Sequence, residues 1–493
     1  MILRPPPPPP DPLDLLLIRL RVMAASRRPI TLPTDLCPSE LDPTPYLQGL
    51  YQLVPPQLLH DILQRTGRAS RRQRRLPAPA TAWLVVALAL FPRYSIPKVW
   101  RQLHPSRRRD DPAASAFTQA RQRLGVAPLG QLFAEVAQLL ATPQTRGAFY
   151  RGLRLMAWDG TTLDLPDTPD NARIFGRPGN DRCPGAFPQV RLLALCELGT
   201  HAICGLQIKP LRCGEVSMAP TLLRHLRPGM LLLWDRLFLS FELVQGVLRQ
   251  GAHVLARVKD DLILREFERL PDGSYKSKIY PTPADRRHDR KGIWVRVICY
   301  THDDPGRPGC GELHRLLTTL LDPEQMPARE APAVYHERWE EELAFDEIKT
   351  HLNGRAVPIR SKTPAGVVQE VYGLVLAHYV IRRVMHDAAR QRKLDPDRLS
   401  FTDTLRVLCS RLHEAPWQSE AAWYAGLVRE VGQQQLRPRR QRWYPRVVKK
   451  VQADYPKKRQ EHRHPPQPTK GFDQAVVLLG PEERTPARQR GSG

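Results

Sequence analysis

Between residues 146 and 260, short apolar segments alternate with helical ones, and this alternation limits the folds that the chain can adopt. The segments LRLMAWDG, PQVRLLALCEL and HAICGLQIKPL have the composition of three successive strands. A helical segment, VSMAPTLLRHL, follows, and then come the strand MLLLWD, the helix FELVQGVLRQG and the strand HVLARVK. The order β-β-β-α-β-α-β predicts an α/β fold in which three hairpin strands precede a helical crossover to a fourth strand.

Two of the predicted strands end in an aspartate. Asp159 closes the first strand and Asp235 closes the fourth. Because open α/β sheets carry their functional groups at the carboxyl ends of strands, both are candidate active-site residues. Each also has an ordinary alternative role, because Asp159 suits a turn and Asp235 suits a helix N-terminus or a surface ion pair. A third acid, Glu215, stands directly before a predicted helix and is interpreted as its cap.

A second pattern lies in the segment YHERWEEELAFDEIK, residues 335–349. At about 100° per residue, four side chains of this segment share one narrow stripe of an α-helix: Tyr335, Arg338, Glu342 and Lys349. A carboxylate flanked by two cations and a phenol suits a divalent metal ion and a phosphodiester better than it suits a core. A charged stripe is also the usual solvated face of a helix, and the nearby Asp346 means that spacing alone does not single out Glu342.

The composition favours a polyanionic partner. The 493 residues carry a net charge of +25, and each Lys or Arg set against a phosphate releases condensed counterions. The 8 cysteines form no Cys-x-x-Cys pair, so a zinc site is not expected, and Cys196 and Cys204 lie in apolar runs typical of buried thiols. The longest apolar run, TAWLVVALALF, is too short to cross a membrane and suits a core helix.

The regions around the α/β segment have different compositions. Residues 1–30 are Pro-rich and then basic, and are expected to be a disordered leader, with Met23 as an alternative start. Residues 31–145 have helical spacing throughout, and SAFTQARQRLG followed by APLGQLFAEVAQLL predicts a helix, a turn at Gly125 and a second helix. This arrangement is typical of helix-turn-helix DNA-binding units, but other three-helix units look the same.

Two further segments follow the second aspartate. Residues 261–330 form a β-rich insertion, because the turn Asp272-Gly273 separates two extended runs and further strand segments follow. The separation of Asp235 and Glu342, 342 − 235 = 107 residues, is too long for a simple loop. Residues 431–493 mix Arg and Lys with aromatic side chains, and predict either an extended nucleic-acid arm or a disordered basic tail.

Together these motifs resemble a known family. The pattern Y-x2-R-x3-E-x6-K at 335–349 resembles the signature helix of insertion-sequence DDE transposases of the insertion-sequence-four type. That family also has an aspartate in an Asp-Gly-Thr motif, as at Asp159, and a second at the end of an apolar strand before Arg, as at Asp235. All three motifs occur in the family's order, and the resemblance extends from about residue 32 to about residue 460.

The resemblance implies an α/β architecture with a ribonuclease-H-like catalytic core over residues 146–430, interrupted by the β-rich insertion and preceded by an all-helical N-terminal DNA-binding domain. It implies that Asp159, Asp235 and Glu342 hold two Mg²⁺ ions, for which Mn²⁺ can substitute. The expected reaction is metal-dependent cleavage at transposon ends followed by strand transfer into target DNA.

The resemblance also implies DNA contacts. Tyr335, Arg338 and Lys349 are expected to hold the transposon end through its phosphates. Trp294, in the insertion, would stack an extruded base, unless it is one more aromatic residue of a strand core. Arg121 and Arg123, in the helical domain, are expected to contact DNA.

The expected partner is double-stranded DNA, bound by a homodimer in a synaptic complex in the bacterial cytoplasm at the nucleoid, with no membrane involved. Two other interpretations stay open at this point. One is a hydrolytic DNA nuclease with the same core, and the other is a catalytically silent, sequence-specific DNA-binding protein descended from a transposase.

Overall fold

The structure is a computed structural model that describes residues 45–437, except 71, 73, 105–110, 181–182, 260, 308–309 and 353–358, together with residues 468–480. The chain divides into two compact units. Unit 1 consists of Met1–Arg146, Asp159–Met218 and Glu341–Gln435, and unit 2 consists of Gly147–Trp158, Ala219–Glu340 and Leu436–Gly493. The predicted leader, residues 1–30, lies outside the described residues.

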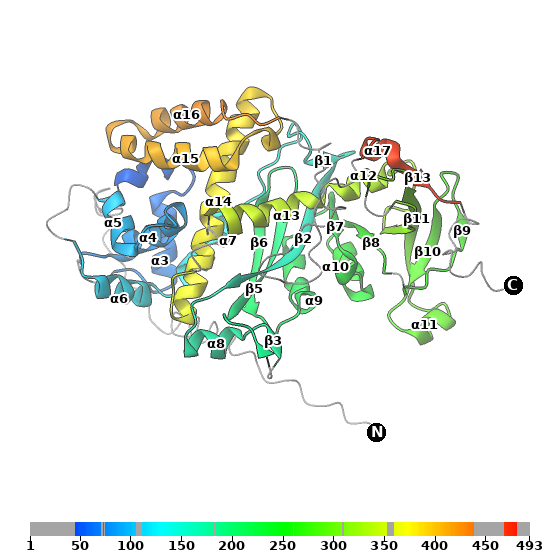
Figure 1. Cartoon of the computed structure of the whole chain (residues 1–493), viewed down its shortest axis with the longest axis horizontal. Helices are drawn as coiled ribbons and strands as arrows, with labels where there is room; N and C mark the ends of the chain where they lie inside the picture. Colours follow the sequence, from blue (N-terminus) through cyan, green and yellow to red (C-terminus); the bar gives the residue numbers. More distant parts are fainter. Residues whose placement is uncertain are drawn as a thin grey trace, which may run out of the picture. The chain divides into compact units, whose positions relative to one another are not determined.

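Unit 1 is built around one long helix, α14 (Pro364–Arg392), whose middle is buried. The apolar run of the sequence forms α4 (Ala78–Leu90), which is almost entirely buried, and it packs against α14 so closely that a Cβ on Gly373 would lie 2.6 Å from the Val85 carbonyl oxygen. The prediction of a core helix here is confirmed. The helices that pack with α14 come from both ends of the unit (Figure 1). They include α6 (Ala114–Leu124), α7 (Ala127–Val136), α15 (Phe401–Arg411) and α16 (Glu420–Val431). The helix α3 (Pro56–Arg65) packs against α4 and α7, and α5 (Ile96–Leu103) lies beside α4 and α6.

The N-terminal region is helical, as the sequence predicts, and the helix–Gly125–helix segment forms as α6 and α7. Gly125 has φ +68, a backbone conformation that side-chain-bearing residues rarely adopt. These helices share a hydrophobic core with α14, α15 and α16, so they belong to a compact unit larger than residues 31–145. A separate DNA-binding domain over 31–145 stays a prediction.

The strand β2 (Leu153–Asp164) is divided between the two units. Its residues up to Trp158 belong to unit 2, and its later residues belong to unit 1. In unit 1, β2 borders β5 (Gln189–Glu197), which pairs antiparallel with β6 (Ala202–Pro210). In unit 2, β2 pairs in parallel with β7 (Met230–Trp234), and β7 pairs in parallel with β8 (His253–Arg257). The fold is therefore mixed α/β, and the five predicted strands of residues 146–260 are present in the predicted order.

Some connections differ in detail from the expectation. The segment after β6 forms a short α9 (Glu215–Met218) and the 3-10 helix η3 (Ala219–His225) rather than one α-helix, while α10 (Phe241–Arg249) forms as predicted. Between β2 and β5 the chain adds α8 (Pro169–Phe175) and a hairpin of β3 (Gly179–Asn180) and β4 (Cys183–Pro184), which the periodicity did not predict.

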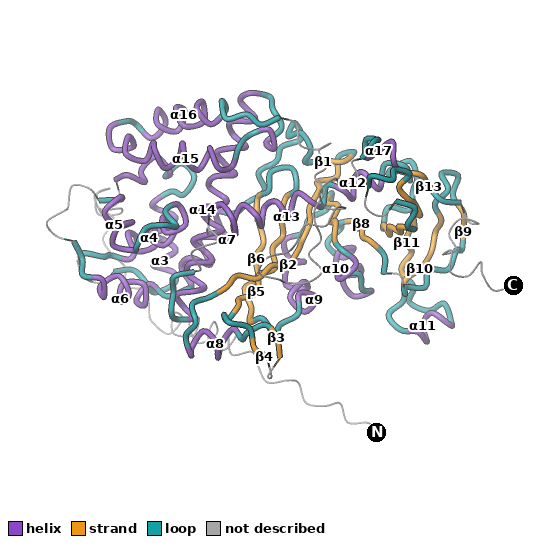
Figure 2. Tube along the Cα trace, viewed as in Figure 1, coloured by secondary structure: helices purple, strands orange, loops and turns teal. Residues whose placement is uncertain are grey.

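Residues 261–330 continue the sheet of unit 2 (Figure 2). The strand β12 (His314–Thr318) pairs with β8, and then follow β11 (Ile293–His302), β10 (Tyr275–Ile279) and β9 (Glu268–Arg269), all antiparallel. The predicted hairpin at Asp272-Gly273 connects β9 to β10, with Gly273 at φ +84. A short helix, α11 (Pro283–Arg287), lies between β10 and β11, and β1 (Phe149–Tyr150) pairs with β2.

The disordered-tail prediction is wrong for residues 468–480. They form α17 (Phe472–Ala475) and β13 (Val476–Leu478), and β13 pairs antiparallel with β11. The physical reason is a buried carboxylate: Asp304 accepts hydrogen bonds from the backbone N–H groups of Thr469 and Lys470, both at 3.2 Å. The rest of the tail, 438–467 and 481–493, lies outside the described residues.

The segment that carries the four-residue stripe is not one regular helix, so this prediction is corrected. It consists of α12 (Ala331–His336), α13 (Trp339–Asp346) and the π-helix η5 (Glu347–Leu352). Around Glu337 and Arg338 the backbone makes i→i−3 hydrogen bonds, and the boundary between the units falls within α13, after Glu340. We call residues 331–352 the signature segment.

The structure also tests the predictions of buried thiols and of no membrane-spanning helix. Cys196 and Cys204 are buried free thiols, and burial is the main cause that raises the pKa of Cys196. Among the described helices none is long and apolar enough to span a bilayer.

Candidate active site

Asp159 lies in β2 and Asp235 directly follows β7, and these two strands pair in parallel. Within unit 2, Ala157 of β2 pairs with Leu233 of β7, and the next residues, Trp158 and Trp234, stack their rings with centroids 5.1 Å apart. Asp235 is the residue directly after β7, as predicted. The prediction that Asp159 closes its strand is wrong, because β2 continues to Asp164 and Asp159 lies two residues beyond Ala157, the last residue paired with β7.

The two aspartates also hold their carboxylates in the same way. Asp159 Oδ1 accepts a hydrogen bond from the backbone N–H of Gly160 at 2.8 Å, and Asp235 Oδ1 accepts one from that of Arg236 at 2.7 Å. Asp235 is the N-cap of the short 3-10 helix η4 (Arg236–Phe238), so the alternative role considered for it is present as well. A cap contact to one oxygen orients the carboxylate but does not use up its acceptor capacity.

Gly160 has a steric reason to be glycine. A Cβ added at this position would overlap the Cδ, Oε1 and Cγ atoms of Glu215. Glu215 is the first residue of α9 and pairs with Arg191 of β5, whose Nη1 lies 2.6 Å from its Oε1. Because neighbouring strand residues point to opposite faces, Glu215 supports β2 from the face opposite the Asp159 side chain. Its role thus extends beyond the helix cap that the sequence indicated.

The face of β2 that carries Asp159 is contacted by the signature segment. Thr161, two residues after Asp159 and on the same face, accepts a hydrogen bond at 3.1 Å from Lys349 Nζ. Glu342, seven residues before Lys349 and partly buried, lies on α13 within the same unit as Asp159 and Thr161. Thr161 was not identified from the sequence, although it is the threonine of the Asp-Gly-Thr motif.

Tyr335 and Arg338 belong to unit 2, where they lie in the electrostatic environment of Asp235. Burial raises the pKa of the Tyr335 phenol, Asp235 raises it further, and Arg338 and Arg257 oppose the shift. The phenol therefore stays protonated at neutral pH and can donate a hydrogen bond. Arg257, at the end of β8, was missed in the sequence, where it is only a cation closing an apolar strand.

Trp294 lies on the surface of unit 2, so the strand-core alternative for it is wrong. Its side chain is 42% exposed, with Phe267 edge-on at 5.5 Å and Lys278 Nζ 4.4 Å above its ring. Lys278 is paired in turn with Asp289 at 2.8 Å. An exposed aromatic ring with a cation at its face suits a nucleic-acid base better than a protein core.

The two arginines of α6 have different environments. Arg121 is buried and donates to Gln369 at 3.1 Å, to the Glu370 carboxylate at 3.2 Å and to the Gly366 carbonyl at 2.9 Å. The prediction that Arg121 contacts DNA is wrong, because its guanidinium is buried and hydrogen-bonded to residues of α14. Arg123 is exposed, and its pKa is lowered by partial desolvation and by the neighbouring Arg74. Its contact with DNA stays a prediction.

The three acids offer a donor set suited to one class of metal ion. Carboxylate oxygens are the hard ligands that Mg²⁺ and Mn²⁺ prefer, and no cysteine or histidine belongs to the set. Asp159 lies within β2, Asp235 follows β7, and Glu342 lies on the helix α13. These residues fit a divalent-metal site for phosphodiester chemistry.

Comparison with known proteins agrees with this chemistry. Residues 150–380 match the family "Transposase DDE domain", and residues 45–134 match "Insertion element 4 transposase N-terminal". The first match spans Asp159, Asp235 and Glu342.

The relatives are transposases too. The Escherichia coli K12 "Transposase InsG for insertion sequence element IS4" is 28% identical over 424 residues, covering 83% of this chain and 93% of the relative. The Escherichia coli K12 relative named "Putative transposase InsZ" is 30% identical over 224 residues, covering 44% of this chain and 73% of the relative. Among solved structures, a piggyBac transposase synaptic complex with hairpin DNA has a TM-score of 0.42 at 12% identity, covering 78% of this chain and 82% of that one.

The matching families and the relatives define a DDE transposase, an enzyme that cleaves DNA and transfers its strands. More narrowly, the chain belongs to the insertion-sequence-four family of DDE transposases, whose N-terminal and catalytic regions it matches in order. The family resemblance noted in the sequence is confirmed, and so is the function in DNA transposition that it implied.

Proposed function

We propose that Asp159, Asp235 and Glu342 are the catalytic, metal-binding carboxylates of this transposase. The observation that supports the proposal is the parallel register of β2 and β7, with Ala157 opposite Leu233, because Asp159 lies two residues beyond Ala157 and Asp235 two residues beyond Leu233. The Lys349–Thr161 hydrogen bond supports the third acid, since it ties the segment of Glu342 to the strand of Asp159.

Two Mg²⁺ ions, or Mn²⁺ in their place, supply the activation of a water or 3′-hydroxyl and the neutralisation of the leaving oxygen when bound. The chain's own residues have separate tasks. The three carboxylates provide hard oxygen ligands, and the backbone N–H groups of Gly160 and Arg236 orient two of them. Tyr335, kept protonated by burial, donates a hydrogen bond to a phosphate.

DNA binding is distributed over both units in this proposal. Arg338 and Lys349 bind phosphates near the cleaved bond, and Arg123 contacts the backbone of the duplex. The exposed Trp294 stacks an extruded base, with Lys278 adding positive charge at its ring. The helices of residues 45–134, which match the family "Insertion element 4 transposase N-terminal", form the end-binding region.

The finer fold and assembly belong to the same proposal. A ribonuclease-H-like core is favoured because β2 borders β5 in unit 1 and β7 in unit 2, with β7 next to β8. The reaction is cut-and-paste transposition of an insertion element, carried out by a homodimer that holds two transposon ends on double-stranded DNA in the bacterial cytoplasm, at the nucleoid.

The test uses the full-length chain and a duplex that carries the terminal inverted repeat of the element, with Mg²⁺ or Mn²⁺. Cleavage and strand transfer are expected for the wild type. They should fall at least about a thousandfold in Asp159→Ala and Glu342→Gln, with DNA binding retained, because removing a metal ligand removes several kcal/mol of transition-state stabilisation. Asp346→Asn is the matched control, because Asp346 is the exposed acid one turn further along α13.

Wild-type levels of cleavage in Asp159→Ala would overturn the assignment of the acids. A pre-cleaved end separates the rival activity: a transposase joins its 3′-hydroxyl to a target plasmid, whereas a hydrolytic nuclease gives no joined product. A wild-type chain that binds the duplex and gives neither product with either metal would be a silent DNA-binding protein.

A further inference from the structure

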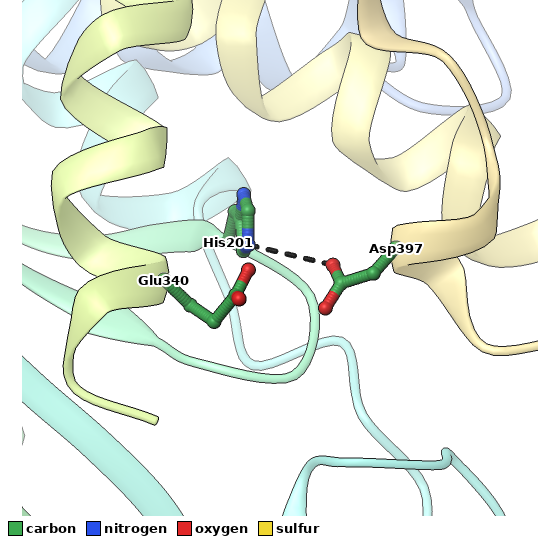
Figure 3. A group of neighbouring side chains, drawn as sticks. All are labelled: His201, Glu340 and Asp397. Carbon is green, nitrogen blue, oxygen red and sulfur yellow. Dashed lines mark ion pairs between the residues drawn. The ribbon is translucent and has the colours of Figure 1, made fainter. Parts of the chain in front are cut away.

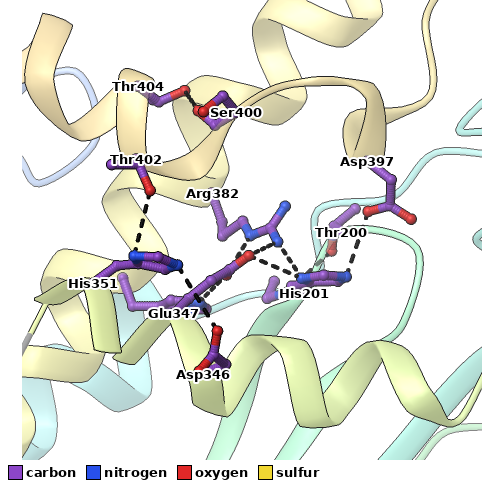
Figure 4. A network of polar contacts seen from close by, with 12 residues as sticks. Thr200, His201, Asp346, Glu347, His351, Arg382, Asp397, Ser400, Thr402 and Thr404 are labelled. Carbon is purple, nitrogen blue, oxygen red and sulfur yellow. Dashed lines mark hydrogen bonds and ion pairs between the residues drawn. The ribbon is translucent and has the colours of Figure 1, made fainter. Parts of the chain in front are cut away.

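In unit 1, a cluster of buried polar side chains connects the signature segment to α14 (Figure 4). It contains Glu347 of η5, Arg382 and His378 of α14, His201 from the turn between β5 and β6, and Asp397 of the 3-10 helix η6 (Pro396–Arg398). All five side chains are buried, among apolar neighbours such as Ile348, Leu352 and Phe401. Charged groups are rarely buried in this way unless they are paired, so the contacts within the cluster decide what it can do.

Glu347 is the centre of the cluster. Its carboxylate accepts a hydrogen bond from Arg382 Nε at 2.9 Å and a second one from Arg382 Nη2, so the pair is bidentate. His378 Nε2 lies 2.9 Å from Oε2 of the same carboxylate. His378 and Arg382 are four residues apart on α14 and therefore share one helix face, which clamps Glu347 from one side.

His201 lies among the charged groups of the cluster. Its Nδ1 contacts Arg382 Nη2 and lies 3.4 Å from Glu347 Oε1. Its Nε2 lies 3.4 Å from Asp397 Oδ1 (Figure 3). Burial, opposed by the hydrogen bond to Glu347, lowers the pKa of His378, so this ring is neutral and donates from Nε2. Although burial opposes it, Arg382 and the histidines hold the pKa of Glu347 well below its usual value.

The position of Glu347 in the sequence links the cluster to the proposed active site. It lies five residues after Glu342 and two before Lys349, and it begins the π-helical segment η5. Glu347 faces α14, whereas Lys349 faces Thr161 on β2. A π-helical turn is rare and is found mostly at functional sites, so this segment is held in a conformation that its neighbours must stabilise.

Stability alone does not explain the cluster. A buried ion pair commonly contributes little net stability, and apolar residues of similar volume often replace it without loss. What such a pair can supply is a single defined arrangement of the elements that carry it. Here those elements are α14, which is the core of unit 1, and the segment that carries Glu342 and Lys349.

We propose that Glu347, held by Arg382, His378 and His201, is a positioning residue that fixes the rotation of the signature segment about its axis. The inference rests on the proposed function, because the rotation matters only if Glu342 is a metal ligand. The contacts of the cluster stabilise the π-helical turn. This turn then determines the orientation of Glu342 and Lys349 relative to β2.

The test replaces the ion pair by apolar residues in the full-length chain, as Glu347→Leu with Arg382→Met. Hydrogen exchange of residues 339–352 is expected to accelerate about tenfold or more, while the middle of α14 is unchanged. The Mg²⁺ concentration that gives half-maximal cleavage is expected to rise about tenfold to a hundredfold, as for residues that orient metal ligands. Glu347→Gln, which keeps the volume, should show the same two changes to a smaller extent.

The matched control is Arg121→Met with Glu370→Leu, which removes another buried ion pair that is also carried by α14. It should leave the exchange of residues 339–352 and the Mg²⁺ requirement unchanged. Wild-type exchange and Mg²⁺ dependence in the Glu347/Arg382 variant would overturn the inference, and so would global unfolding of both Glu347 variants, because the cluster would then hold the fold rather than the segment. If the wild type itself shows no metal-dependent cleavage, the proposed function fails first, and accelerated exchange alone would then mark a structural contact.

Discussion

The two halves of the proposed active site are held by different kinds of contact. Asp159 lies in β2 and Asp235 directly follows β7. The backbone pairing of these parallel strands and the Trp158–Trp234 stack fix the positions of the residues before the two aspartates. Glu342 and Lys349 lie on an irregular helix, where side chains far apart in the sequence, such as Glu347 and Arg382, hold the conformation. The strand half is fixed by the sheet, whereas the helix half depends on a few polar contacts that single substitutions can remove.

The largest expected effect separates the two roles of Asp235 in the strand half. Asn caps helices as well as Asp does, so Asp235→Asn should keep the N-cap of η4 and leave thermal stability within about 0.5 kcal/mol. Metal-dependent cleavage should nevertheless fall about a thousandfold, because a neutral amide is a poor ligand for Mg²⁺. Calorimetry and a cleavage assay on one preparation test both statements, and wild-type cleavage would reduce Asp235 to a cap.

The second prediction tests whether the strand half is held by packing on its other face. Gly160→Ala inserts a Cβ where Glu215 lies, and should destabilise the chain by about 1–3 kcal/mol. The double variant Gly160→Ala with Glu215→Ala should recover most of that loss, because the obstructing side chain is gone. Denaturant unfolding measures both changes.

Gly214→Ala is the control for this pair, because nothing lies within 4 Å of a Cβ added at Gly214, the residue before Glu215. Equal losses of stability in Gly160→Ala and Gly214→Ala would show that backbone freedom, and not the Glu215 contact, requires the glycine.

A smaller effect is expected in the helix half. Lys349→Met keeps the length of the side chain and removes the hydrogen bond to Thr161, together with one phosphate contact. Cleavage should fall about tenfold, and the salt dependence of DNA binding should lose about one phosphate contact. Thr161→Val removes the hydrogen bond alone, so it should reduce cleavage without changing the salt dependence, and an unchanged salt slope in Lys349→Met would exclude the phosphate contact.

The contrast between the halves also explains what the sequence could predict. Asp159 and Asp235 were found because an apolar strand ending in an acid is a local pattern, and the order of strands follows from the same runs. Arg121 was misjudged because its partners, Gln369 and Glu370, are 248 and 249 residues away, and a helical arginine looks the same whether it faces solvent or core.

The same limit applies to the signature segment. Its spacing predicted one straight helix, because the sequence carries no local sign of the π turn at Glu347 or of the irregular turn at Arg338. Nothing in the sequence distinguishes Glu347 from Asp346, and only its burial against α14 does so. Likewise, residues 468–480 lie in a basic tail, and the carboxylate that orders them, Asp304, is more than 160 residues away.

The smallest expected effect is a pH dependence where residues 468–480 meet α12, the helix of Tyr335. Phe472 stacks on His336 with centroids 4.4 Å apart and meets His302 edge-on at 5.3 Å. Burial, with His314, Arg307 and His336 nearby, lowers the pKa of His302 to about 4, and burial also lowers that of His336. Both rings are therefore neutral in the docked state at neutral pH.

A histidine whose pKa is lowered by docking binds more protons when the segment is released. Docking should thus be fully stable above a pH of about 6.5 and weaken as the pH falls from about 6.5 toward 4, because released histidines take up protons first. Exchange rates corrected for pH, or limited proteolysis, should show residues 468–480 losing protection at pH 5 relative to pH 7.5, while α4 keeps its protection. Equal protection of this segment at both pH values would mean that Asp304, which stays ionised over this range because its hydrogen bonds lower its pKa, holds the segment by itself, and the helix half would then have a support that acid does not weaken.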